Sequence, residues 1–179
     1  MGPEHHLLSP QIESSTRMEI SMTSEVHHVG LTVGNLQRSV DWYCTHLGLR
    51  EIGRARLDGS KISTQTDLPE TEIDVALLAG SNTVLELLCY ASPPGDPYRL
   101  RCCDVGAAHV CVVVDDLEAT VTAMRSCGVF FHAEPTQLVG ETKMVYVRDP
   151  DGVMVELIEP KGDLTLAALC ATHAIHPES

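Results

Sequence analysis

Residues 28–40, HVGLTVGNLQRSV, recur 81 residues later as residues 109–121, HVCVVVDDLEATV. In both stretches a histidine precedes alternating apolar residues, the pattern of a β-strand that buries one of its faces. A polar residue that can cap a helix follows, Asn35 in the first copy and Asp116 in the second. Identical residues stand at His28/His109, Val29/Val110, Val33/Val114, Leu36/Leu117 and Val40/Val121. The chain therefore contains an internal repeat that begins with a strand and a helix.

The remainder of each copy can be aligned as well. The helices are predicted over Leu36 to Leu47 and Leu117 to Cys127, and the glycine after each supplies a left-handed stop. Further strands are predicted at 49–57, 72–79 and 83–90 in the first half and at 129–134, 142–148 and 153–159 in the second. VLELL at 84–88 overlays MVELI at 154–158, so Glu86 aligns with Glu156. Each half is thus predicted to be β-α-β-β-β.

The repeat also predicts the domain boundaries. We expect a flexible N-terminal extension (1–25), a first βαβββ module (26–91), a linker around SPPGDP (92–106), a second βαβββ module (107–160) and a C-terminal tail (161–179). The first half has a longer connection at about 58–71. The tail is expected to add a short helix, Leu164 to Ala174.

Composition narrows the range of partners. The 179 residues are enough to bury a core, and 44% of them are hydrophobic. With 25 acidic and 12 basic residues the net charge is −13, which disfavours binding to nucleic acid or to an anionic membrane. No apolar run approaches the roughly 20 residues needed to cross a bilayer, and the start lacks a secretory signal. The seven cysteines form no CxxC pair, so we expect reduced thiols in a cytoplasmic protein that acts on small molecules.

Side-chain alternation assigns the repeated polar residues to one face of each sheet. In the predicted strands, the apolar positions face the helix, and the histidines and glutamates face the other way. These four residues are His28, Glu86, His109 and Glu156. If that face is enclosed, an ionised carboxylate needs a compensating partner, and one divalent metal would satisfy all four groups. The donor set suits Zn, Ni, Co, Mn or Fe(II). The alternative is that each histidine is a satisfied edge residue and each glutamate lies on a solvated face.

The repeated segments resemble the vicinal oxygen chelate superfamily, which includes glyoxalase I, methylmalonyl-CoA epimerase, extradiol dioxygenases and antibiotic-resistance proteins. The resemblance covers about 26–160 and is strongest in HHVGLTVGNLQRSVDWYCTHLGL, HVCVVVDDLEATVTAMRSCGV and VYVRDPDGVMVELIEP. It implies an α+β fold in which paired βαβββ modules form an open, metal-centred barrel, the glyoxalase/bleomycin resistance/dioxygenase fold. By position, the implied metal ligands are His28, Glu86, His109 and Glu156.

The resemblance also implies a reaction. A complete His, Glu, His, Glu set is similar to that of the lyase and isomerase branch, in which a metal-bound carbonyl substrate loses a neighbouring proton to give an enediolate or enolate. Glu156 resembles the carboxylate that acts as the base, and Asp74 is expected to face the cavity as a second acid. A divalent metal is the implied cofactor, with no nucleotide, and a small-molecule carbonyl compound is the implied substrate.

Substrate contacts differ from those of glyoxalase I. That enzyme carries an arginine four residues after its first ligand and an asparagine four after its second, both contacting glutathione. Here those places hold Thr32 and Tyr90, which argues against glutathione and for a less charged or more aromatic substrate. Arg99 and Arg101 are candidates for contacting an anionic group.

Two other functions stay open at the level of sequence. An extradiol dioxygenase would hold Fe(II) with His28, His109 and Glu156, although Glu86 would then crowd the site. A metal-free small-molecule-binding protein of the resistance type is a different class, and it normally lacks the ligand set. The resemblance has a further implication for assembly. Members of this superfamily pair their modules within or between chains, so we expect a homodimer and leave the mode of pairing open.

Overall fold

The computed structural model describes residues 25–139 and 141–161. The first half contains β1 (Val29–Thr32), α1 (Leu36–Leu47), β2 (Arg50–Asp58), α2 (Ser60–Thr66), β3 (Glu72–Ala79) and β4 (Val84–Ser92). The second half contains β5 (His109–Val113), α3 (Leu117–Ser126), β6 (Thr136–Val139), β7 (Thr142–Arg148) and β8 (Met154–Glu159).

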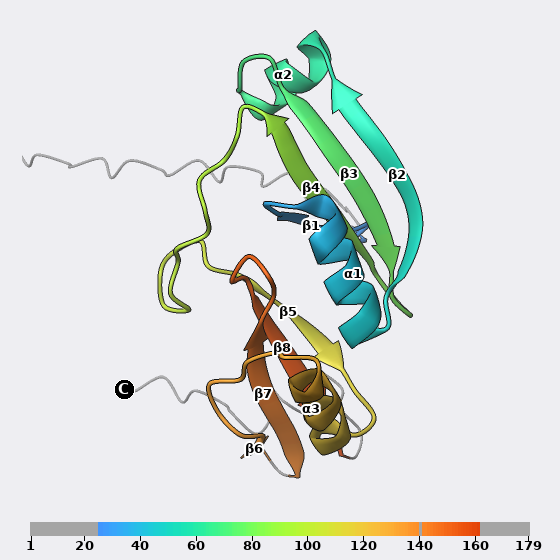
Figure 1. Ribbon diagram of the computed structural model, residues 1–179, viewed down its shortest axis with the longest axis vertical. Helices are drawn as coiled ribbons and strands as arrows, with labels where there is room; N and C mark the ends of the chain where they lie inside the picture. The colour runs from blue at the N-terminus through green and yellow to red at the C-terminus, as the bar shows by residue number, and fades with distance from the viewer. Residues whose placement is uncertain (1–24, 140, 162–179) are drawn as a thin grey trace, which may run out of the picture.

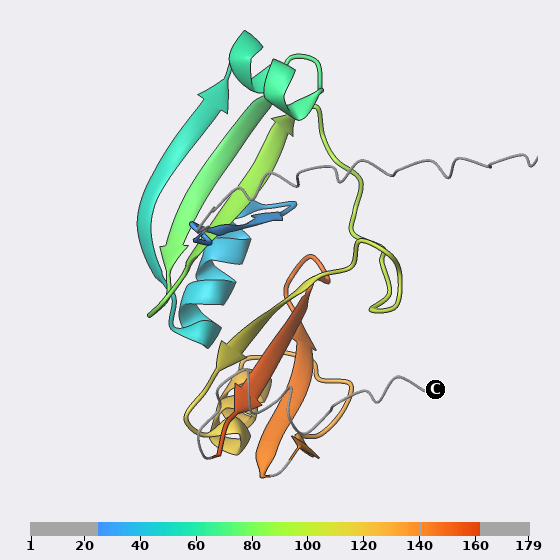
Figure 2. The same ribbon diagram turned by 180° about the vertical axis from the view of Figure 1, so that it is seen from behind.

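Each half forms its own mixed sheet. The strand orders are β1-β4-β3-β2 and β5-β8-β7-β6, so the two sheets have the same topology. In each, the first strand pairs in parallel with the last, and the other pairings are antiparallel. Figure 1 shows one sheet above the other, with α1 and α3 on the side of the sheets that faces the viewer. Figure 2 shows the molecule from the opposite side, where β7 and β8 lie in front of α3. The predicted fold of paired βαβββ modules is confirmed.

The two repeated helices begin and end for the reasons found in the sequence. Asn35 accepts a hydrogen bond from the Arg38 backbone N–H at 2.9 Å, and Asp116 accepts one from the Ala119 N–H at 2.9 Å. Helix α1 ends at Gly48, whose φ of 66° lies in the left-handed region that glycine adopts at little cost.

Two elements differ from the sequence prediction. The strand expected at 129–134 is instead β6, Thr136–Val139. Phe131 is buried in the core and Val129 packs against it without strand pairing, because β7 finds its partner only from Thr136 onward. The longer connection at 58–71 contains α2. The predicted tail helix and most of the N-terminal extension lie outside the described residues.

The two modules share a core, and polar contacts join them. The core cluster combines α1, β3 and β4 of the first module with α3, β7 and β8 of the second. The turn that precedes β8 supplies two acids: Asp149 accepts a hydrogen bond from the Tyr43 hydroxyl at 3.1 Å, and Asp151 accepts one from the Gly34 N–H at 3.0 Å. Asp151 also pairs with Arg38. The sequence DPDG therefore serves as more than a turn, because it ties α1 to the second sheet.

Burial governs the protonation of the contact between Tyr43 and Asp149. Tyr43 is fully buried, and desolvation together with the nearby Asp149 charge raises the pKa of its phenol. Desolvation also raises the pKa of Asp149, although the backbone N–H groups of Val153 and Asp151 oppose that rise. The phenol therefore stays protonated at neutral pH and donates its hydrogen bond to Asp149.

Two further observations concern the cysteines and the helices. The described cysteines, Cys44, Cys89, Cys102, Cys103, Cys111 and Cys127, are all free thiols. Across residues 25–139 and 141–161, every helix is too short or too polar to cross a membrane.

Removing the Tyr43 hydroxyl should weaken the whole fold. In Tyr43→Phe the buried Asp149 loses its side-chain donor, so we expect the free energy of unfolding to fall by about 1–2 kcal/mol in urea titrations. Tyr90→Phe is the matched control, since no hydrogen bond of the Tyr90 hydroxyl is found among the described residues. Equal stabilities of the two variants would show that this contact does not hold the modules together.

Candidate functional site

Two histidine–glutamate pairs occupy equivalent places in the two sheets. His28 Nε2 lies 3.3 Å from Glu86 Oε2, where β1 begins beside β4. His109 Nε2 lies 3.1 Å from Glu156 Oε2, where β5 begins beside β8. Each histidine side chain is close to half exposed, at 41% and 45%, while the glutamates are more enclosed, at 22% and 13%. Each pair thus presents one nitrogen and one carboxylate to a site that remains open to solvent.

Alternation along the strands places both pairs on the faces away from the helices. Leu85 and Leu87 on β4 are buried in the core, and Glu86 between them points to the opposite face. Val155 and Leu157 flank Glu156 on β8 in the same way. The sequence prediction that these glutamates face away from the helices is therefore confirmed.

The neighbours of the two glutamates differ. Gly30 on β1 and Leu77 on β3 lie across from Glu86. At the corresponding positions beside Glu156 are Cys111 on β5 and Tyr146 on β7. A Cβ at Gly30 would lie 3.3 Å from Leu88 Cδ1 and 3.8 Å from Glu86 Oε2, so glycine leaves space there.

Cys111 and Tyr146 give Glu156 a polar surrounding that Glu86 lacks. Desolvation and the Glu156 carboxylate raise the pKa of the Cys111 thiol to about 11. Desolvation, followed by the charge of Glu156, also raises the pKa of Tyr146. Both groups therefore keep their protons at neutral pH and are donors toward Glu156. The Tyr146 ring also meets the His109 ring edge to face, with centroids 5.6 Å apart.

The two pairs are not brought together within the chain. Across residues 25–139 and 141–161, no group of three or more histidine, cysteine, aspartate or glutamate side chains lies close enough to hold a metal ion. Each pair is thus half of the predicted four-ligand set. The donors themselves, imidazole nitrogen and carboxylate oxygen, fit a divalent transition metal.

Asp74 does not lie with these residues. The β3–β4 register puts it across from Cys89, which packs against the core on the helix side of the sheet. Its carboxylate is 3.0 Å from Arg56, with which it forms an ion pair. The prediction that Asp74 faces the same cavity as Glu86 is wrong, because strand register rather than position in the sequence decides which face it shares.

The predicted substrate contacts are spread over two regions. Thr32 is exposed on β1, and Tyr90 is half-buried on β4, on the face that Glu86 shares. Arg99 and Arg101 are exposed in the linker, and Arg101 pairs with Asp104 at 2.8 Å. None of these four contacts either histidine–glutamate pair through a hydrogen bond or ion pair that the structure records.

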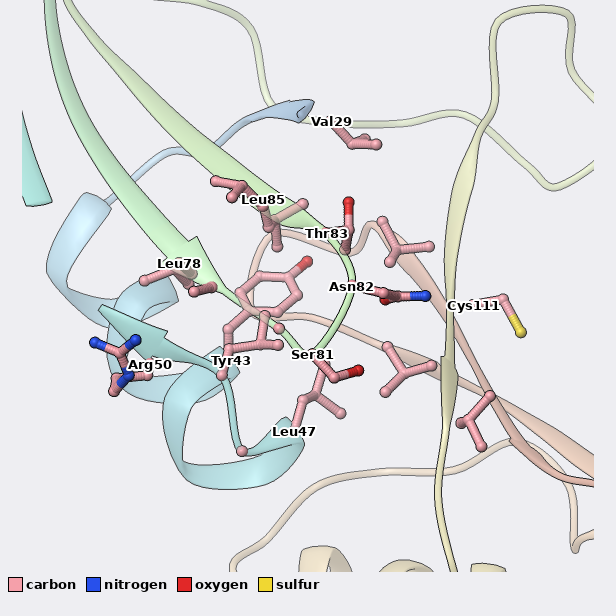
Figure 3. Close-up of a pocket in the computed structure, with 18 residues that line it drawn as sticks. Val29, Tyr43, Leu47, Arg50, Leu78, Ser81, Asn82, Thr83, Leu85 and Cys111 are labelled. Atoms are coloured by element: carbon pink, nitrogen blue, oxygen red, sulfur yellow. The ribbon is translucent and has the colours of Figure 1, made fainter. Parts of the chain in front are cut away.

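A separate cavity of about 620 Å³ lies between the modules, bordered by α1, the turn joining β3 to β4, and β5. Figure 3 shows Tyr43, Leu47, Leu78 and Leu85 gathered on one side of it, while the Cys111 thiol points out of it across β5. We call the pair His28 and Glu86 and the pair His109 and Glu156 the two half-sites. This cavity is distinct from them, because none of these four residues lines it.

Sequence reasoning missed Tyr146 and Arg148. A signal was present, since Val145 and Val147 are buried and the residues alternating with them must lie on the open face. Arg148 lines a small cavity beside His109, together with Tyr146.

Comparison with known proteins shows the family of the chain. Residues 25–157 match the model of the family described as "Glyoxalase/Bleomycin resistance protein/Dioxygenase superfamily". The chain belongs to the glyoxalase/bleomycin resistance/dioxygenase superfamily. A lactoylglutathione lyase of Neisseria meningitidis is 32% identical over 148 residues, which cover 78% of this chain and 94% of the relative. One of Haemophilus influenzae is 30% identical over 141 residues, covering 76% and 93%.

Solved structures of the superfamily share the fold. A glyoxalase family protein of Bacillus cereus superimposes with a TM-score of 0.73 at 21% identity, covering 81% of this chain and 99% of that one. The trypanothione-dependent glyoxalase I of Leishmania major superimposes with a TM-score of 0.58 at 25% identity, covering 85% and 94%. The coverage of both partners shows that the similarity extends over both modules.

Proposed function

We propose that the chain is a divalent-metal-dependent lyase or isomerase, similar to glyoxalase, that removes a proton next to a carbonyl group. The observation that carries this proposal is the pair of matched histidine–glutamate half-sites on the helix-free sheet faces, at 3.3 and 3.1 Å. If the glutamates were only solvated surface residues, there would be no reason for a histidine to lie beside the glutamate at the same place in both sheets. The relatives named as lactoylglutathione lyases support the same class of reaction.

His28, Glu86, His109 and Glu156 would hold the metal. When bound by these residues, a divalent ion would supply Lewis acidity to a substrate carbonyl, which would lower the cost of removing the neighbouring proton. Two nitrogen and two oxygen donors are compatible with Zn, Ni, Co, Mn or Fe(II).

Glu156 is the group we assign to proton transfer. Its carboxylate would take the proton from the carbon next to the carbonyl and return it to the neighbouring carbon in an isomerisation. Cys111 and Tyr146 are hydrogen-bond donors that can hold the Glu156 carboxylate in place as it changes from metal ligand to proton acceptor. Glu86 has Gly30 and Leu77 in those positions, so its surroundings favour a fixed ligand.

A second copy of the chain would complete the site. The contacts of Asp149 and Asp151 with α1 fix the modules to each other on their helix sides, leaving both half-sites open. We propose a homodimer in which the His28 half-site of one chain meets the His109 half-site of the other. We retain the cytoplasm as its expected location, in keeping with the free described cysteines.

Metal content should depend on both half-sites. We expect His28→Ala and His109→Ala each to lower zinc or nickel affinity at least about tenfold, because each removes one ligand and breaks a pair. The measurement is titration of the purified dialysed protein, with metal content determined after gel filtration. His132→Ala is the control, since His132 contacts Phe130 and neither half-site. Full metal occupancy in His109→Ala would overturn the assignment.

The two glutamates should have different effects on catalysis. Thr32 and Tyr90 argue against glutathione, but the glutathione adduct of methylglyoxal is the first probe because it is the compound that the named relatives suggest. With it, Glu156→Gln should lower proton exchange with deuterated solvent by about 10²–10⁴-fold at equal metal occupancy. Glu86→Gln should lower exchange only in proportion to the metal it loses. Nuclear magnetic resonance of the carbon next to the carbonyl reports the exchange, with metal-free protein as baseline. Equal losses at equal occupancy would contradict the assignment of Glu156 as the base.

Mixing two inactive variants tests the pairing of modules. If the site forms between chains, a mixed dimer of His28→Ala and His109→Ala contains one intact site and one doubly altered site. Unfolding and refolding the variants together should therefore restore up to about a quarter of wild-type metal capacity and activity by random pairing. If each site formed within one chain, both sites of the mixed dimer would carry one substitution, and no recovery would occur.

A further inference from the structure

A small cavity of about 160 Å³ adjoins His109 on the open face of the second sheet. Strands β7 and β8 form one part of it, and the linker between the modules forms another. The linker runs from the end of β4 to the start of β5 along one side of the sheets (Figure 1). The residues that line the cavity include Tyr98, Leu100, Tyr146, Arg148 and Met154.

Alternate residues of the linker face this cavity. Tyr98, Leu100 and Cys102 line it, while the residues between them, Arg99 and Arg101, do not. The two arginines that the sequence offered for anion binding therefore lie outside the cavity, and the cation that lines it is Arg148 of β7.

Arg148 is half-buried and has no carboxylate partner within residues 25–139 and 141–161. Its guanidinium donates one hydrogen bond to the Gly152 carbonyl. The carboxylate of Glu156, on the neighbouring strand, pairs with His109 instead. A partly desolvated cation without a counter-charge is costly, so the remaining guanidinium donors are suited to an anion from outside the chain.

The volume limits what can enter. Sites for complete drug-sized ligands usually measure about 300–1,000 Å³, so a cavity of about 160 Å³ accommodates only part of a molecule. Because His109 lines the same cavity, that part is continuous with whatever binds at the half-site of His109 and Glu156.

We propose that this cavity binds the anionic arm of the substrate, with Arg148 as the residue that selects a carboxylate. The substrate class is a small 2-oxo or 2-hydroxy carbonyl compound with a short aliphatic arm that ends in a carboxylate. Leu100 and Met154 contact the arm, and the guanidinium pairs with its end. The inference rests on the proposed function only for the end of the substrate that carries the carbonyl group and would bind the metal.

Two acids that differ only in the distal group test this inference. 2-Oxoglutarate and 2-oxopentanoate have chains of equal length and the same 2-oxo acid end, and only the former has a distal carboxylate. Their affinities for the full-length protein can be measured by calorimetry with and without one equivalent of zinc. We expect 2-oxoglutarate to bind wild type about tenfold or more tightly than 2-oxopentanoate, because charge-assisted hydrogen bonds are the stronger kind.

The variants should separate recognition from folding. Arg148→Met should abolish the preference for 2-oxoglutarate, and Arg148→Lys should keep part of it, since lysine supplies charge without the planar fork. Arg99→Met is the matched control, an exposed linker arginine outside the cavity that should keep the full preference. Thermal unfolding of each variant identifies any that fail to fold.

The results also distinguish this inference from the proposed function. A preference for 2-oxoglutarate that persists without zinc, and shows no dependence on metal, would support the arm site while contradicting the metal enzyme. Zinc-dependent binding of both acids with equal affinity would support the metal site and overturn the arm site. Undetectable binding of both acids to wild type, or an unchanged preference in Arg148→Met, would also overturn it.

Discussion

The structure depends on each sheet packing one of its two faces against a helix. Helices α1 and α3 cover one side, and the apolar residues of β4 and β8 point toward them. Because side chains alternate along a strand, every polar residue between those apolar positions must emerge on the other side. Glu86 and Glu156 are fixed in this way by the packing of their neighbours. The half-sites thus follow from the same pattern that builds the core.

The contacts between modules determine where a complete site can form. Asp149 contacts Tyr43 of α1, and Asp151 contacts Arg38 of α1 and Gly34 just before it. The helix sides of the two modules are therefore already joined. In the proposed homodimer, a second copy would supply the missing half of the site while these contacts stay in place.

The internal repeat supplies matching histidine–glutamate pairs, and the two glutamates have different neighbours. Gly30 and Leu77 beside Glu86 correspond to Cys111 and Tyr146 beside Glu156. The first pair adds no hydrogen-bond donor from its side chains, whereas the second adds two. In the proposed metal site, Glu86 would therefore stay fixed, and Glu156 would be held by protein donors while it transfers a proton.

The sequence by itself determined the local features. The repeat gave the two modules, the capping residues and glycine gave α1 its exact bounds, and alternation placed the histidines and glutamates on one face. These features depend on residues close together in the chain. The same reasoning failed for Asp74 and for the strand expected at 129–134, because strand register and choice of partner depend on residues far apart.

Only the tertiary structure decided how the parts combine. It revealed that DPDG joins the modules, that the half-sites remain apart within a chain, and that Arg148 rather than Arg99 or Arg101 lines the cavity beside His109. Each of these results depends on contacts between distant segments. Such contacts are fixed by packing and charge pairing across the whole fold, and no periodic pattern in the sequence encodes them.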